Sequence, residues 1–301
     1  LTITTVTLAT GIWLEVSLRR VAVLGDDPAR PAPGSGTNWL LVGSDGRSDL
    51  SPEQQAELST GGDLGSSRTD TILLVHVPAL LSTEPTALVS IPRDSYLEIP
   101  GWGMDKVNAA FAAGGAPLLT QTVEQATGLR IDHYAEVGFG GFGAVVDALG
   151  GVRICLPEPL NDPLAGVDLP AGCQAVDGRN ALGYVRSRDT PRADLDRMQH
   201  QREFMAALLE RIGSPAVWLN PWRWYAVPHA VVGALSVDEG AHVWDLARLA
   251  WALHGGATTL TVPIGEFTGN ASGAVVVWDI DAADALFGAL RTDAPIPQLV
   301  L

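Results

Sequence analysis

The sequence predicts an α/β fold in which helices cover a mostly buried central sheet. Three short runs of apolar, largely β-branched residues have the length of strands, at 38–43, 71–77 and 87–91. They are nearly continuous in apolar character, which is typical of strands that are covered on both faces. Later apolar runs alternate with amphipathic segments, the order expected of an α/β protein.

The other elements follow from helix start and stop signals and from short β-branched runs. Pro117 suits the first turn of a helix that Gly128 ends, and Gly213 with Pro215 ends the longest helix. Strands are predicted at 131–137, 152–156, 258–264 and 274–278, and helices at 117–126, 142–149, 194–212, 238–254 and 282–290, with a further helical start at 180–188. The C-terminal third extends the domain rather than standing alone.

One stretch stands out as a candidate binding edge. The run 87–91 stops at Pro92, which cannot donate to a central strand ladder and biases Ile91 toward an extended conformation. Arg93 should therefore lie just past the carboxyl end of its strand. Ligands of α/β sheets bind at that edge.

Composition limits the ligands that this chain can bind. Its 301 residues include 34 acidic and 19 basic side chains, which gives a formal net charge of −15. Binding to nucleic acid depends on a basic footprint, so that class of partner is excluded. An anionic ligand would have to be bound by a local cluster of cations, and Lys106 is the only lysine.

The N-terminal residues 1–16 are apolar apart from threonines and Glu15, and Arg19 and Arg20 follow. A bilayer core of ~30 Å needs ~20 residues of helix, so this stretch alone is too short to cross it. Two interpretations are equally open: the end of a membrane helix, or an element of the globular body. Residues 26–37, rich in proline and glycine, are predicted to be a spacer. We therefore predict a membrane-proximal segment and linker at 1–37 and one globular domain at 38–301, to which any catalytic site would belong.

The two cysteines, Cys155 and Cys173, flank a loop rich in proline, glycine and aspartate. No set of four zinc ligands surrounds them. The favoured interpretation is a disulfide, which would place the domain outside the cytosol, and the alternative is two buried free thiols.

Charged residues gather at the predicted strand ends, although any one pair could equally be solvated surface ions. Arginine binds phosphate oxygens bidentately, and aspartate oxygens suit Mg²⁺, so the set could hold an anionic ligand together with a metal. No P-loop or GxGxxG motif follows a strand, so use of ATP or NAD is unsupported. The set comprises Asp45, Arg47, Arg68, Asp70, Arg93, Asp94, Lys106, Arg186, Arg188, Arg197 and Gln201.

The order and spacing of six motifs within this set resemble the LytR-CpsA-Psr family over about residues 38–292. The motifs are GSDGR at 43–47, RTDT at 68–71, SIPRD at 90–94, KVNAAF at 106–111, YVRSR at 184–188 and DLDRMQHQ at 194–201. The resemblance implies an α/β/α sandwich around a mixed sheet with a hydrophobic lipid channel. It also implies an enzyme, anchored on the extracellular face of the cell membrane, that moves a glycopolymer from a polyprenyl-pyrophosphate carrier onto peptidoglycan. Arabinogalactan and teichoic acid are candidate polymers.

The resemblance also assigns roles to individual residues. Asp45 and Asp70 match the family's metal ligands, for Mg²⁺ or Mn²⁺. The pyrophosphate set is Arg68, Arg93, Lys106, Arg186, Arg188, Arg197 and Gln201, of which Arg68, Arg93, Arg186 and Arg188 are the predicted catalytic arginines. One position departs from the family pattern: His200 stands where a second arginine is usual, and Arg202 could compensate for it.

Two other functions share these residues. A pyrophosphatase acting on the same lipid would differ only in using water as the acceptor. A non-catalytic polyprenyl-phosphate-binding or regulatory module would have no need of two metal aspartates, so the enzyme is favoured.

The lipid tail should find a channel between sheet and helices that opens beside Arg93, Arg186 and Arg188. Helical periodicity places Phe204 and Leu208 on the side of the 194–212 helix that carries Arg197 and Gln201. The alternative is that these apolar residues simply pack against the sheet.

Overall fold

The computed structural model describes residues 2–25, 27–46, 53, 69–187, 194–270 and 272–297; at 2–9, 194–199, 201, 202, 209 and 218 only the backbone is described. The chain divides into two compact units. The first, here called the helical unit, contains residues 1–18, 46–65 and 137–235. The second, the sheet unit, contains residues 19–45, 66–136 and 236–301. Each is described by itself.

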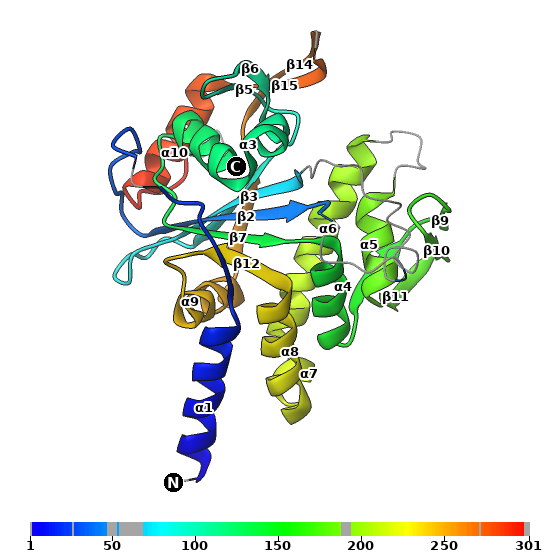
Figure 1. Ribbon diagram of the computed structural model, residues 1–301. Coiled ribbons are helices and arrows are strands. Elements are labelled where there is room, and N and C mark those ends of the chain that lie inside the picture. The colour runs from blue at the N-terminus through cyan, green and yellow to red at the C-terminus, as the bar shows by residue number, and fades with distance from the viewer. Residues whose placement is uncertain are drawn as a thin grey trace. The chain divides into compact units, whose positions relative to one another are not determined.

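The sheet unit is built on a seven-stranded mixed sheet in the order β1-β12-β7-β2-β3-β4-β13. Figure 1 labels the middle strands β12, β7, β2 and β3, which lie side by side in this order. Strands β2, β3 and β4 are successive antiparallel neighbours, whereas β13 adds to β4 and β12 to β1 in parallel. The strands are β1 (Arg19–Val21), β2 (Thr37–Ser44), β3 (Thr69–Val77), β4 (Thr86–Ile91), β7 (His133–Val137), β12 (Leu235–Asp238) and β13 (Ala257–Thr261). The predicted α/β class and mixed sheet are thus confirmed.

Helices cover both faces of this sheet. Leu40, Leu74 and Val89 point to one face and form a core with helices α3 (Val107–Thr127) and α10 (Ile280–Arg291). Trp39, which precedes Leu40 on β2, points to the other face, where it borders a small cavity with His133 and with Leu249 of α9 (Val243–His254). Successive residues of a strand face opposite ways, so continuous apolar runs fit this two-sided burial.

Two hairpins complete the sheet unit: β5 (Tyr96–Ile99) with β6 (Gly103–Lys106), and β14 (Ile264–Asn270) with β15 (Gly273–Trp278). Helix α3 begins ten residues before the predicted Pro117. Its two halves meet at a kink, where Gly114 and Gly115 leave helical geometry and Gly115 has φ +64°. The first half of α3 was not predicted from the sequence, because a glycine pair normally interrupts a helix.

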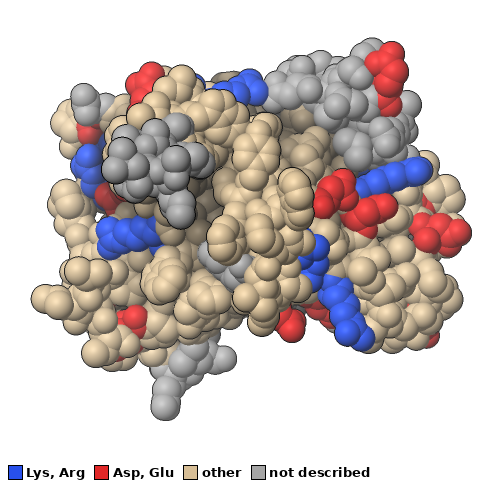
Figure 2. All heavy atoms as spheres, turned by 90° about the horizontal axis from the view of Figure 1, so that it is seen from below, with Lys and Arg blue, Asp and Glu red and all other residues tan. Residues whose placement is uncertain are grey.

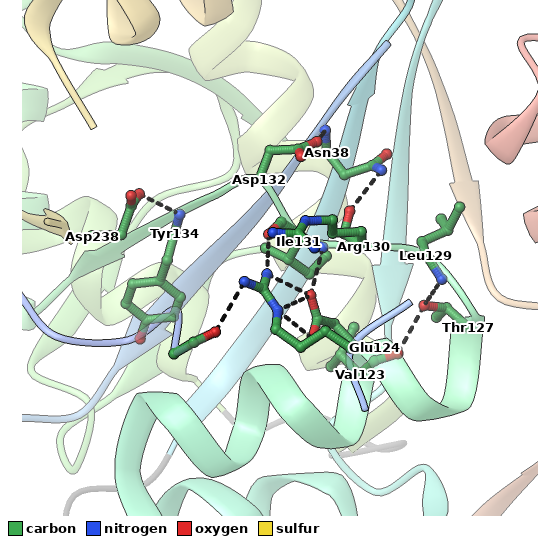
Figure 3. A network of polar contacts seen from close by, with 12 residues as sticks. Asn38, Val123, Glu124, Thr127, Leu129, Arg130, Ile131, Asp132, Tyr134 and Asp238 are labelled. Atoms are coloured by element: carbon green, nitrogen blue, oxygen red, sulfur yellow. Dashed lines mark hydrogen bonds and ion pairs between the residues drawn. The ribbon is translucent and has the colours of Figure 1, made fainter. Parts of the chain in front are cut away.

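Part of the predicted linker is fixed to the sheet unit by a buried ion pair. The Arg30 guanidinium donates to both carboxylate oxygens of Glu124 at 2.8–3.1 Å and to the Ile131 carbonyl at 2.6 Å. Glu124, on α3, also accepts the Ile131 N–H at 2.8 Å, and neighbouring bonds join Asp132 to Asn38 (Figure 3). A buried charge needs such partners on every side, so the segment around Arg30 packs as part of this unit.

The helical unit surrounds a second core, and its elements are α1 (Thr2–Ser17), α4 (Phe139–Ala148), β8 (Val152–Leu156), β9 (Leu160–Asp162), β10 (Val167–Leu169), β11 (Gly172–Val176), α5 (Gly178–Arg186), α6 (Asp194–Gly213), α7 (Pro215–Trp218) and α8 (Pro221–Ala234). Phe204 of α6 is buried in this core, with its ring centroid 5.2 Å from that of Phe142. Leu208 packs beside it. Phe204 and Leu208 therefore pack in the core of the helical unit, and their place beside a lipid channel stays a prediction.

Residues 2–17 form a single helix, α1. Among the helices that the structure describes, none combines the length and the apolar character that crossing a membrane requires.

The disulfide between Cys155 and Cys173 is confirmed. The two residues are directly opposite each other in the antiparallel pair of β8 and β11, and this register brings their Cα atoms to 3.9 Å. The enclosed loop is more regular than its composition predicts, because β9 and β10 form a hairpin within it.

Reduction of this disulfide is expected to destabilise the protein more than it lowers activity. Closing a loop of this length constrains the unfolded chain by roughly 3 kcal/mol, and neither cysteine is one of the predicted pyrophosphate or metal ligands. Thermal unfolding of wild type with and without reductant, and of Cys155→Ala/Cys173→Ala, measures the effect. An unchanged unfolding midpoint would contradict the prediction.

Candidate functional site

The loop after β4 holds Arg93 in a fixed backbone frame. Arg93 follows the strand and Pro92, as predicted. Two contacts from β15 hold the next residues: the Val276 N–H donates to the Asp94 carbonyl, and the indole N–H of Trp278 donates to the buried hydroxyl of Ser95, both at 2.9 Å. The loop is therefore anchored on the side of β15.

The same loop also receives the start of α3. The N–H groups of Val107 and Asn108 donate to the carbonyls of Ser95 and Arg93 at 2.8 and 3.2 Å. The first N–H groups of a helix have no partner within it, and here the loop supplies partners. Lys106, at the end of β6, precedes α3 directly, so Arg93 and Lys106 are held by one backbone arrangement.

Four side chains meet at this place, and we call them the strand-end cluster: Asp70, Arg93, Asp94 and Lys106. Arg93 Nη1 is 2.5 Å from Asp70 Oδ1, and its Nε is 3.3 Å from Asp94 Oδ2. Lys106 Nζ is 2.9 Å from Asp94 Oδ1. These side chains are only 18–31% exposed, so their pairing is less screened than that of surface ions.

A β-bulge places Asp70 in the cluster. Gly43 pairs with Thr71 and Ser44 pairs with Thr69, so Asp70 is an extra residue with no opposite number on β2. Thr69 is fully buried, and its hydroxyl donates to the Gly43 carbonyl at 3.1 Å. A bulge interrupts the alternation of side chains and can redirect one of them toward a site.

Asp45 lies at the same end of the sheet as Asp70. It follows Ser44, the last residue of β2, and Ser44 pairs with Thr69 beside Asp70. Carboxylate oxygens are the hard ligands that Mg²⁺ prefers. Within the part of the chain that the structure describes, His, Cys, Asp and Glu side chains do not gather in threes at a metal-binding spacing. Two carboxylates do not complete the coordination of Mg²⁺, so a metal here would also need phosphate or water oxygens, and the metal site stays a prediction.

Arg186 belongs to the helical unit, in the last turn of α5. Its guanidinium carbon lies 4.9 Å from the centre of the Phe139 ring, a cation–π contact. The following Ser187 is buried and donates to Asp162 Oδ2 at 3.0 Å, while the other Asp162 oxygen accepts two N–H groups of the loop after β9. This network fixes the end of α5, where Arg186 lies.

His200, the residue that departs from the family pattern, packs against Tyr184. Their rings are stacked with centroids 4.5 Å apart. The Tyr184 hydroxyl donates to Glu203 at 3.0 Å, and burial together with this contact raises the pKa of Tyr184 above its usual range. A histidine here fills an aromatic contact between α5 and α6.

The remaining predicted residues are placed only in part. Arg47, Arg68 and Arg188 lie outside the described residues. Arg197, Gln201 and Arg202 lie on α6, but their side chains are outside the described set, so their predicted roles stay predictions.

Two contacts of the site were not predicted from the sequence, although Asp94 was in the predicted charged set. Asp94 bridges both cations, and its position next to Arg93 was the available signal for this role. Trp278 is 183 residues from Ser95, and nothing in the local sequence pattern links them.

The comparisons with solved structures agree with the α/β fold described above. The solved structure "LytR-Csp2A-Psr enzyme from Actinomyces oris" matches with a TM-score of 0.70 at 24% identity, over 91% of this chain and 96% of that one. The solved structure "TagT bound to LI-WTA" matches with a TM-score of 0.64 at 24% identity, over 90% and 98%. At this identity the likeness shows the fold, including the predicted α/β/α arrangement.

The family model LytR_cpsA_psr matches residues 23–285, and the chain belongs to the LytR-CpsA-Psr family. The "Probable cell wall biosynthesis protein LcpB" of Corynebacterium glutamicum is 55% identical over 93% of this chain. The "Cell wall biosynthesis protein LcpA" of the same organism is 35% identical over 89% of it. The chain spans 66% and 58% of the lengths of these two relatives.

Proposed function

We propose that this chain carries the catalytic part of a cell wall glycopolymer transferase. It would move a glycopolymer from a polyprenyl-pyrophosphate carrier onto peptidoglycan on the extracellular face of the membrane. Family membership and the names of the Corynebacterium relatives support a role in cell wall biosynthesis. TagT, whose fold this chain shares, was solved bound to LI-WTA, which supports a wall polymer as ligand. The disulfide fits an oxidising compartment.

The observation that carries the proposal is the strand-end cluster. It places a guanidinium and an ammonium, Arg93 and Lys106, on one carboxylate of Asp94, at the end of a central strand. The chain has a net charge of −15, so an anionic ligand must be bound by a few neighbouring cations. Arg93 and Lys106 are such a pair and could bind a pyrophosphate. The acidic partners hold them in place before the ligand arrives.

The reaction would proceed as follows. A hydroxyl oxygen of peptidoglycan attacks the phosphorus next to the glycopolymer, and the bond from that phosphorus to the bridging oxygen breaks. Polyprenyl phosphate leaves with the bond's electron pair, the glycopolymer becomes a phosphodiester of the acceptor, and the hydroxyl proton passes to a base. Arg93 and Lys106 would bind the phosphate oxygens on which negative charge grows, and such positioning and charge stabilisation supply most of phosphoryl-transfer catalysis.

Asp45 and Asp70 are the proposed ligands of Mg²⁺ or Mn²⁺, which when bound would neutralise pyrophosphate charge. The Asp70 carboxylate also pairs with Arg93, so it links the proposed metal position to the phosphate-binding guanidinium. Asp70 would thereby orient the Arg93 fork toward the ligand.

The lipid part of the carrier also needs a site. A polyprenyl chain gains ~0.8 kcal/mol for each CH₂ that is removed from water, so a hydrophobic channel remains part of the proposal. Its lining residues are predictions that a lipid-bound structure would test.

A transfer assay separates this function from the alternatives. The chain is incubated with a short polyprenyl-pyrophosphoryl oligosaccharide, Mg²⁺ and peptidoglycan, and the products are analysed by mass spectrometry. Oligosaccharide joined to peptidoglycan through a phosphodiester supports the transferase. Release of free oligosaccharide phosphate regardless of acceptor would identify a pyrophosphatase, and retention of unchanged lipid would identify a binding module; either result would overturn the proposal.

A further inference from the structure

The helical unit carries an exposed apolar surface on α7, α8 and the turn between them. Leu219, Trp222 and Tyr225 are 80%, 85% and 64% exposed. Trp222 and Tyr225 are three residues apart in α8 and so lie on one side of that helix. We call these three residues the aromatic face. Such exposure of large apolar side chains in one place usually marks an interaction surface.

The aromatic face is rigidly built. The Asn220 side chain caps α8 by accepting the Trp222 N–H at 3.1 Å, and Pro221 occupies the first turn. Arg223 Nη1 donates to the Ala216 carbonyl at 2.8 Å, which ties α8 back to α7. The side chains of the aromatic face are therefore held by hydrogen-bonded helices and the turn between them.

Helix α1 extends the same kind of surface. The Trp13 ring packs on His229 of α8 with centroids 5.0 Å apart, and His229 in turn contacts Tyr225. Near this contact α1 exposes Ile12 and Val16. Seen from below, much of the coloured surface consists of residues other than Lys, Arg, Asp and Glu (Figure 2).

Charge and residue type indicate the partner. Residues 213–237 contain no acidic side chain, although the whole chain has 34, and Arg223 is their one fully charged residue. Trp and Tyr combine an apolar ring with a polar N–H or O–H group and concentrate where lipid head groups meet acyl chains. Aromatic side chains are also enriched at protein–protein interfaces, so the local lack of acidic groups is the feature that favours an anionic lipid surface.

We propose that the aromatic face docks on the surface of a phospholipid bilayer that contains anionic lipid. Trp222 and Tyr225 would enter the head-group region, Leu219 would reach the acyl boundary, and the missing acidic groups would remove repulsion from anionic head groups. This inference goes beyond the proposed transfer reaction and stands whether or not the chain transfers a polymer.

Vesicle binding by the full 301-residue chain tests the proposal, using vesicles of phosphatidylcholine with phosphatidylglycerol and no substrate. Leu219→Ser/Trp222→Ser/Tyr225→Ser is expected to lower the vesicle partition coefficient by at least about tenfold, because it removes three large apolar anchors. The matched control is Leu80→Ser/Leu81→Ser/Trp102→Ser, whose native side chains in the sheet unit are similarly exposed. Because both variants retain α1, their difference reports on the aromatic face alone.

The expected pattern is wild-type binding in the control variant, weaker binding to vesicles of phosphatidylcholine alone, and quenching of tryptophan fluorescence by brominated lipid in wild type. Equal loss in both triple variants, or no loss in either, would overturn the proposal. Sedimentation without vesicles measures the oligomeric state and tests a second copy of the chain as the partner. A wild-type dimer that becomes monomeric only in the Leu219/Trp222/Tyr225 variant would assign this face to that second copy and overturn the proposal.

Discussion

Replacing Arg93 with alanine is expected to lower the rate of polymer transfer at least tenfold, through a loss of about 2 to 4 kcal/mol of transition-state stabilisation. The substitution removes a guanidinium fork that is held by Asp70 and Asp94 at the end of β4. The fold should persist, because main-chain groups and Ser95 hold the loop. Transfer rate and unfolding midpoint are measured on the same preparation.

Two further variants sharpen this test. Arg93→Lys keeps the charge but loses the bidentate geometry, so it should recover only part of the rate. Arg153→Ala removes an exposed arginine on β8 in the helical unit and should leave the rate unchanged. An Arg93→Ala protein that transfers polymer at the wild-type rate would remove Arg93 from the site.

Removal of the metal ligands is expected to abolish activity. EDTA should stop transfer, Mg²⁺ or Mn²⁺ should restore it, and Asp45→Ala/Asp70→Ala should stay inactive at any metal concentration, because both hard oxygen ligands are gone. Asp284→Ala, which removes an exposed carboxylate on α10, is the matched control.

Because Asp70 also pairs with Arg93, activity alone would not identify the metal role. Binding of Mn²⁺, followed by electron paramagnetic resonance in the absence of substrate and with added inorganic pyrophosphate, gives an independent readout. Wherever the wild type binds Mn²⁺, with or without pyrophosphate, the double variant should bind it more weakly. Equal affinity in wild type and double variant, or full activity in chelator, would reject Asp45 and Asp70 as ligands.

The parts of the fold that were predictable are those with a strong local signal. The strands at 71–77 and 87–91 are uninterrupted apolar runs, and β3 and β4 contain them. Pro92 placed Arg93 beyond the strand end, because its missing N–H stops the ladder. The pairing of Cys155 with Cys173 could be predicted because the two residues flank one loop, although the strands that bring them opposite each other could not.

The parts that were not predictable depend on contacts between distant segments. The bulge at Asp70 arises from the pairing of β3 with β2, which local propensity does not encode. The bond from Trp278 to Ser95 exists only once β15 has packed beside the loop. Helix α8 was not predicted because it contains two prolines, Pro221 and Pro228, although the first of them suits a helical first turn.

Native mass spectrometry of the purified chain tests binding of the polyprenyl carrier directly, because it detects the lipid itself. The protein is isolated from bacterial membranes in mild detergent and transferred intact to the gas phase. A polyprenyl phosphate or pyrophosphate is expected to accompany the wild-type chain; Arg93→Ala should retain less of it, and Arg153→Ala should retain the wild-type amount. A wild-type chain that carries no such lipid, and that fails to bind added polyprenyl pyrophosphate, would contradict the proposed carrier.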